Sequence, residues 1–84
     1  MPGYAGGDLD RSEAMFRKGL ELDPHFTALR VGLAKTLIRR GRAAEARKEL
    51  ERVLTDRVPT SQADFSVHDV PEARQLLESI RGTS

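Results

Sequence analysis

Two stretches share one pattern 34 positions apart, GDLDRSEAMFRKGL at residues 7–20 and GRAAEARKELERVL at residues 41–54. In both stretches, small or apolar residues recur at intervals of three and four, which is the spacing of one face of an α-helix. A glycine opens each stretch. A period of this length, built from helices and turns, indicates a helical hairpin that stacks against copies of itself.

Helix and turn signals along the rest of the chain predict an all-α protein of four antiparallel helices with no β-strand. Pro24 separates the first two helices, because a proline disfavours helical geometry in the residue before it. Gly41 follows the second helix, where a residue in the left-handed conformation is expected. Pro71 is placed at the first position of the last helix. The predicted segments are a flexible loop over 1–7, helices over 8–23, 26–40 and 42–57, an irregular loop over 58–70, and a capping helix over 71–81.

The pattern over about residues 7–57 resembles the tetratricopeptide repeat family. The family's second-helix motif, Ala-x3-Phe followed by a proline, is present as Ser12-x3-Phe16 and then Pro24. It recurs as Ala46-x3-Leu50. Small residues in such motifs let helix backbones approach, and the larger ones fill the space between them.

The family's first-helix motif, Trp-x2-Leu-Gly-x2-Tyr, corresponds to Arg30-x2-Leu33-Ala34-x2-Leu37, so both aromatic residues are missing. The resemblance implies a fragment of a helical-hairpin solenoid with about one and a half repeats and a C-terminal helix. Its alignment places Gly7 in the turn between the two helices of a unit whose first helix is absent. We therefore expect the chain to be the C-terminal part of a longer repeat array.

The same resemblance implies a module for protein–protein interaction or scaffolding, without catalytic activity. In the family, the first helix of each unit lines the concave surface that binds partners. Lys35 on this helix is suited to donate hydrogen bonds to the backbone or a carboxylate of a bound peptide. By alignment, the groove candidates are Ala28, Val31, Lys35, Ile38 and Arg39.

Charge is unevenly distributed, although the formal net charge is only +1. Seven basic residues and one acidic residue lie between Arg30 and Lys48, while acidic residues predominate in 8–23 and 56–84. This pattern indicates an electropositive surface for an acidic protein or peptide, with a basic patch of Arg40, Arg42 and Arg47. Asparagine, which the family's carboxylate-binding sites use, does not occur in the sequence.

Two other kinds of partner remain open. The basic region is also compatible with contacts to nucleic-acid phosphates. The near-zero net charge and the lack of aromatic residues among the basic ones argue against it. Self-association as a homo-oligomer is the other alternative. The first helix lacks the neighbouring helix expected in a repeat array, so it would bury Met15 and Phe16 across a dimer interface instead.

Several functions lack the residues that they require. There is no cysteine, and His25 and His68 lie 43 positions apart, so no common zinc-binding spacing is present. No serine has a histidine at helical spacing, and the glycine-rich residues 2–7 lack the lysine of a phosphate-binding loop. We predict no catalytic residue, no metal and no cofactor. No apolar run is long enough to cross a bilayer, and no signal peptide is visible, which favours a cytoplasmic location.

Overall fold

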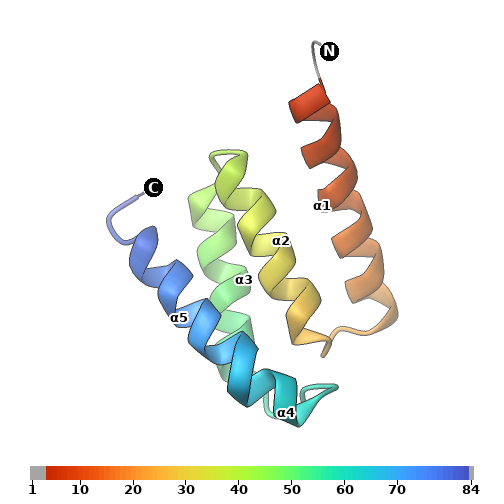
Figure 1. Ribbon diagram of the computed structural model, residues 1–84, viewed down its shortest axis with the longest axis vertical. Helices are drawn as coiled ribbons and strands as arrows, with labels where there is room; N and C mark the ends of the chain where they lie inside the picture. Colours follow the sequence, from red (N-terminus) through yellow and green to blue (C-terminus); the bar gives the residue numbers. More distant parts are fainter. Residues whose placement is uncertain (1–3, 84) are drawn as a thin grey trace.

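Consecutive helices lie antiparallel and side by side (Figure 1). The computed structural model describes residues 4–83, and no β-strand occurs in that range. The predicted all-α class is confirmed. The elements in chain order are α1 (Tyr4–Leu22), α2 (Thr27–Arg39), α3 (Ala43–Thr55), the short α4 (Gln62–Asp64), a π-helical turn η1 (Phe65–Asp69) and α5 (Val70–Ser79).

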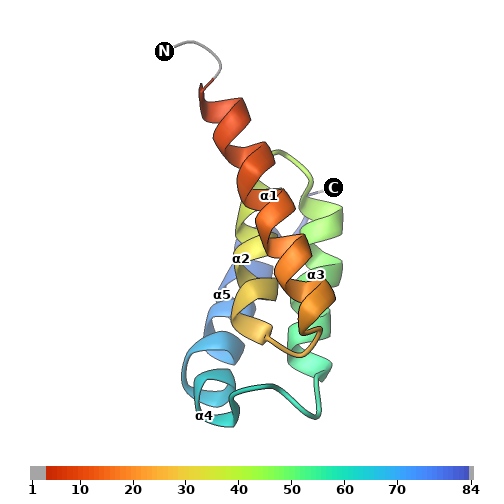
Figure 2. The same cartoon turned by 90° about the vertical axis from the view of Figure 1, so that its right-hand side faces the viewer.

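The helices form a slab rather than a sphere, with extents of 41 × 31 × 17 Å. Helix α2 packs on both α1 and α3, and α3 packs in turn on α5. Helix α1 therefore lies at one edge of the slab and α5 at the other (Figures 1 and 2). This arrangement leaves one side of α1 without a helical neighbour in the described part of the chain.

The core lies mainly between α2 and α3. Leu33, Leu37, Leu50 and Val53 are the largest side chains that are fully buried. Burial of each such side chain contributes about 1.5–3 kcal/mol relative to exposure. Alanines lie between these large residues and let the helix backbones approach closely; they are Ala34, Ala46 and Ala73, all fully buried.

Gly41 ends α2 as the sequence predicts. Its φ is +76°, in the left-handed region that favours glycine. The backbone N–H of Gly41 donates to the carbonyl of Ile38 at 3.0 Å, and that of Arg42 donates to the carbonyl of Leu37 at 2.9 Å. These two bonds satisfy carbonyls at the helix end and turn the chain back into α3.

The N-terminal segment differs from the prediction of a flexible loop over 1–7. Helix α1 begins at Tyr4 and continues without a break through Gly7, while residues 1–3 lie outside the described residues. Gly7 is therefore helical, unlike its repeat counterpart Gly41. Each residue added to an existing helix gains a backbone hydrogen bond and does not repeat the cost of helix nucleation. Here this gain outweighs the cost of about 1 kcal/mol for each glycine in the helix.

The predicted irregular loop over 58–70 is also wrong for most of its length, because residues 62–79 form one continuous helical run. The Ser61 side chain caps this run by accepting a hydrogen bond from the N–H of Asp64. The wide turn η1 then precedes Pro71, whose ring would otherwise clash with the preceding helical turn. Asp69 fixes the turn on α2, since its buried carboxylate accepts a 2.7 Å hydrogen bond from Thr27 Oγ1.

Candidate partner-binding groove

A groove crosses α2 and extends toward α1 on one side and α5 on the other. It consists of two adjoining hollows of about 320 Å³ each, which share Lys35 and Arg39. One hollow opens toward α1 and the other toward α5. We call this surface the α2 groove and define it by its lining residues, Ser12, Phe16, Gly32, Lys35, Thr36, Ile38, Arg39 and Leu76.

The wall of the groove near α1 depends on a close approach of Phe16 to Gly32. A Cβ atom at position 32 would lie 2.6 Å from two ring carbons of Phe16, so only glycine lets the ring rest there. Sequence reasoning did not place Phe16, Gly32 or Leu76 in a groove. The signal for Gly32 was available, because a glycine inside a helix costs stability and so indicates a packing requirement.

Lys35 and Arg39 lie where the two hollows of the groove meet, and their surroundings differ. The Lys35 ammonium pairs with the Glu72 carboxylate of α5, and about half of the Lys35 side chain is exposed. Arg39 is exposed and pairs with no carboxylate among residues 4–83. Since a guanidinium carries five N–H donors in a fixed plane, Arg39 is the group in the groove with the greatest capacity to bind an anion.

Only three of the five residues predicted for the groove line it in the structure. Lys35, Ile38 and Arg39 line it, and Ile38 is half-buried. Ala28 is exposed on α2 but lines neither hollow. Val31 is only 3% exposed and belongs to the core, so its assignment to a binding surface is wrong. The alignment placed it one position away from the exposed stripe of α2.

Two residues of the predicted basic patch, Arg40 and Arg42, are paired with carboxylates. Asp10 pairs with Arg40, Glu45 pairs with Arg42, and Glu13 of α1 pairs with both. One oxygen of the Glu13 carboxylate accepts hydrogen bonds from Arg40 at 2.9 Å and Arg42 at 2.8 Å, and the other accepts from Arg17 at 2.9 Å. Burial alone would raise the pKa of Glu13, but the hydrogen bonds and charges of Arg17 and Arg42 outweigh it. The pKa of Glu13 therefore lies below its ordinary value.

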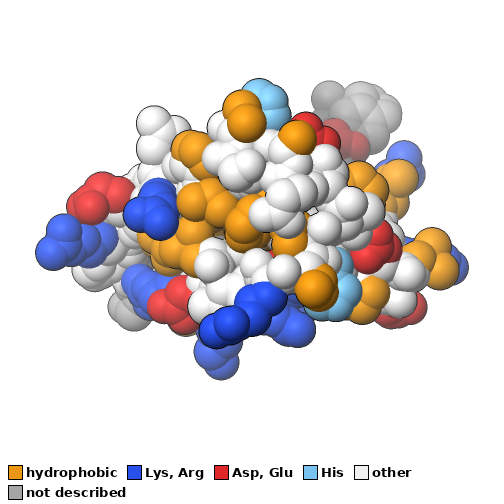
Figure 3. Space-filling model, turned by 90° about the horizontal axis from the view of Figure 1, so that it is seen from below, with side chains coloured by type: hydrophobic (Ala, Val, Ile, Leu, Met, Phe, Trp, Pro, Cys, Tyr) orange, Lys and Arg blue, Asp and Glu red, His pale blue; other side chains and the backbone are white. Residues whose placement is uncertain are grey.

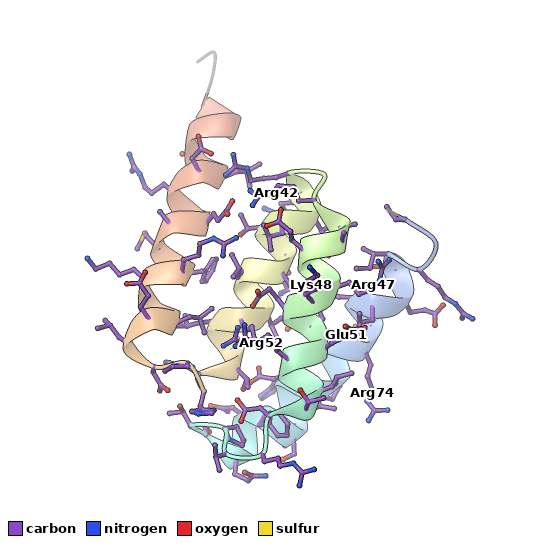
Figure 4. The ribbon with its side chains drawn as sticks, turned by 180° about the vertical axis from the view of Figure 1, so that it is seen from behind. Arg42, Arg47, Lys48, Glu51, Arg52 and Arg74 are labelled. Atoms are coloured by element: carbon purple, nitrogen blue, oxygen red, sulfur yellow. The ribbon has the colours of Figure 1, made fainter. Side chains whose placement is uncertain are left out.

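The remaining basic residues do not form one surface either. Arg47 lies on the side of α3 that faces α5 (Figure 4), where it donates to the carbonyls of Ile80 at 3.1 Å and Thr83 at 2.8 Å. The Arg30 side chain is only 8% exposed and pairs with Glu49. The interpretation of residues 30–48 as a single electropositive surface is therefore wrong. The acidic residues that pair with the cations of this range come from three helices, Asp10 and Glu13 from α1, Glu45 and Glu49 from α3 and Glu72 from α5. The charge count along the chain did not take these contacts into account.

Within residues 4–83, no group of three or more histidine, aspartate and glutamate side chains is arranged to hold a metal ion. No helix in the same range is long and apolar enough to pass through a bilayer. The α2 groove is a surface of mixed apolar and cationic character.

The family model of the tetratricopeptide repeat matches residues 4–64, which is most of the chain. The chain therefore belongs to the tetratricopeptide repeat family, and the resemblance found in the sequence is confirmed. Neither a curated protein nor a solved structure matches it. Membership supports a protein-interaction module in general terms.

Proposed function

We propose that the chain is a non-catalytic protein-interaction module that binds an acidic peptide segment of a partner in the α2 groove. Exposed Arg39 carries the proposal, because it lies where the two hollows meet and has no carboxylate partner in residues 4–83. A carboxylate of the partner would supply the missing anion through charge-assisted hydrogen bonds. Half-buried Phe16, Ile38 and Leu76 around it would contact apolar side chains of the same segment.

Lys35 sets the selectivity of the groove in this proposal. Its ammonium already has an anion, Glu72, so a partner carboxylate at Lys35 must replace that contact. Partners with one well-placed carboxylate near Arg39 should therefore bind better than those with two anions along the groove. An apolar residue beside the carboxylate would add affinity by covering Ile38 and Leu76.

A titration with a short peptide of glutamate and leucine residues tests the proposal. We expect backbone NMR shifts at residues 32–39 and 72–76, and at least a tenfold loss of affinity for Arg39→Glu, because the charge at the contact is reversed. Lys48→Glu is the matched control, since it makes the same charge change on α3 at an exposed residue outside the groove. Equal losses for both variants, or shifts elsewhere only, would contradict the proposal.

A second candidate function is self-association or packing against a further repeat through α1. Met15 and Leu22 are 68% and 82% exposed, and α1 packs mainly on α2 among the helices described. A second copy of the chain, or a preceding repeat in a longer array, would cover them. Sedimentation distinguishes these two occupants. A dimer that is dissociated by Met15→Gln supports self-association. A monomer at high concentration contradicts self-association and favours a preceding repeat as the partner that covers α1.

A further inference from the structure

Another hollow lies where the turn between α1 and α2 meets the C-terminal end of α3. It has a volume of about 300 Å³ and shares no residue with the α2 groove. We call it the arginine hollow and define it by His25, Arg30, Arg52, Asp56 and Arg57, which line it together with neighbouring loop residues. Seen from this end of the molecule, a histidine side chain lies next to a group of basic side chains (Figure 3).

The hollow has an excess of positive charge. Three arginines and one histidine line it, against a single acidic residue, Asp56. The Asp56 carboxylate is already engaged, because both of its oxygens lie 3.1 Å from Nδ1 of His25. One of these oxygens also accepts a 2.9 Å hydrogen bond from the N–H of Val58. The Asp56 carboxylate is therefore engaged by His25 and Val58, which leaves the charges of Arg52 and Arg57 available to a ligand.

Arg52 and Arg57 are the available cations. Both are exposed, and neither pairs with a carboxylate in the part of the chain that the structure describes. Figure 4 places Arg52 on the side of α3 that faces α1 and α2. Two glutamates of α3 are paired with other arginines, Glu45 with Arg42 and Glu49 with Arg30, which itself lines the hollow.

Arg30 forms the floor of the hollow in a fixed position. Its side chain is only 8% exposed, and it donates 2.7 Å hydrogen bonds to Glu49 and to the carbonyl of Pro24. These bonds use two of the five N–H donors of the guanidinium. A buried arginine held in this way is pre-organised, so a bound anion would not have to order it first.

The hollow continues toward α1. An adjoining depression of about 300 Å³ shares Pro24, Arg30 and Arg52 with it and adds the side chains of Arg17, Leu20, Glu21, Leu33 and Glu49. An anion in the arginine hollow would therefore sit at the end of a channel lined by both charged and apolar side chains, in which Glu49 is already paired with Arg30. This channel offers room for residues that flank the anion in a peptide.

We propose that the arginine hollow binds a phosphate monoester dianion, carried either by a phosphorylated side chain of a partner or by a small molecule. Arginine suits this ligand because its planar N–H donors match two phosphate oxygens at once. A dianion also balances the two unpaired charges of Arg52 and Arg57. The site goes beyond the function proposed for the α2 groove, and the two can be occupied independently.

The test uses NMR titration of the isotope-labelled chain with O-phosphoserine, with a phosphoserine peptide, and with the same peptide carrying glutamate instead. We expect saturable shifts at residues 24–25 and 52–58, in the millimolar range or tighter for the phosphopeptide. Tighter binding of the phosphopeptide than of O-phosphoserine would assign the phosphate to a partner segment. Equal affinity would assign it to a small molecule.

Variants separate a specific site from general attraction between charges. Arg52→Gln with Arg57→Gln should lower the affinity about tenfold or more, since it removes both free guanidinium groups. Arg11→Gln with Arg74→Gln removes the same charge at exposed residues outside the hollow and should leave the affinity within about twofold. If the first pair impairs folding by circular dichroism, Arg57→Gln alone makes the same comparison with Arg11→Gln. Equal losses for variant and control, equal binding of the glutamate peptide, or no saturable shift would overturn the proposal.

Discussion

Glu13 of α1 accepts a 2.8 Å hydrogen bond from Nη1 of Arg42, the residue that precedes α3. The same oxygen binds Arg40, at the end of α2. The Glu13 carboxylate therefore joins α1 to both ends of the turn between α2 and α3, and Asp10 of α1 pairs with Arg40 as well. These contacts matter because α1 lies at the edge of the slab and has few other attachments among the described residues.

Glu13→Gln should lower the free energy of unfolding by about 1–3 kcal/mol, because it replaces hydrogen bonds to a charged and largely buried group by weaker neutral ones. Urea unfolding followed by circular dichroism measures this change. Glu21→Gln is the matched control, since it makes the same change at an exposed residue of α1. Similar stabilities for the two variants would show that the hydrogen bonds of the Glu13 carboxylate to Arg17, Arg40 and Arg42 contribute nothing to the fold.

Acidification should destabilise the protein through the same carboxylates. The pKa of Glu13 is lowered in the folded state, and so is that of Asp23, chiefly by a hydrogen bond from Thr60 Oγ1. A carboxyl with a depressed folded pKa adds stability above its unfolded pKa, about 4.5 for glutamate, and loses it as the pH falls through the folded value. Urea unfolding at about pH 7 and about pH 3 should show this loss. The loss should be smaller in Glu13→Gln, and an equal loss would remove Glu13 as a cause.

The sequence predicts the central hairpin well because its signals are local. The spacing of Leu33, Leu37 and Leu50 marks the faces that meet in the core, and Gly41 marks the turn between them. The residues of the groove are harder to predict, because neighbouring positions of α2 point in different directions. An alignment error of one position therefore moves a residue from the exposed side of the helix to the core. Val31 shows this, since it falls in the core rather than in the groove.

The charged surface could not be read from the order of residues. Arg40 and Arg42 look like part of a basic region until α1 folds back and brings Glu13 against them. Such pairs join residues 27 and 29 positions apart, so only the packing reveals them. The helical run from Gln62 was missed for a similar reason, because the contact between Thr27 and Asp69 that holds it is not local.

Gly41→Ala should lower stability by about 1–2 kcal/mol, since its φ of +76° is unfavourable for a residue with a Cβ. No atom lies within 4 Å of the position that a Cβ would take, so the cost comes from the backbone alone. In a chain of this size the change corresponds to roughly 4–8 °C in Tm per kcal/mol. Gly41→Asn is the control and should cost less, because asparagine tolerates the left-handed region. If Gly41→Ala and Gly41→Asn have the same Tm, the loss of stability does not arise from the positive φ at this position.

Thr27→Val should destabilise the contact between α2 and η1. Thr27 Oγ1 donates a 2.7 Å hydrogen bond to Oδ2 of Asp69, and both residues are buried. Valine has nearly the same shape but no donor, so the Asp69 carboxylate loses a partner in a place that water reaches poorly, at a cost of about 1.5–3 kcal/mol. Thr27→Ser keeps the hydroxyl and loses only a methyl group, at about 0.8 kcal/mol. Chemical denaturation should therefore give a lower free energy of unfolding for Thr27→Val than for Thr27→Ser. Amide hydrogen exchange in residues 62–79 should also be faster in Thr27→Val. Equal stability of the two variants would mean that packing, and not the hydrogen bond to Asp69, holds η1 on α2.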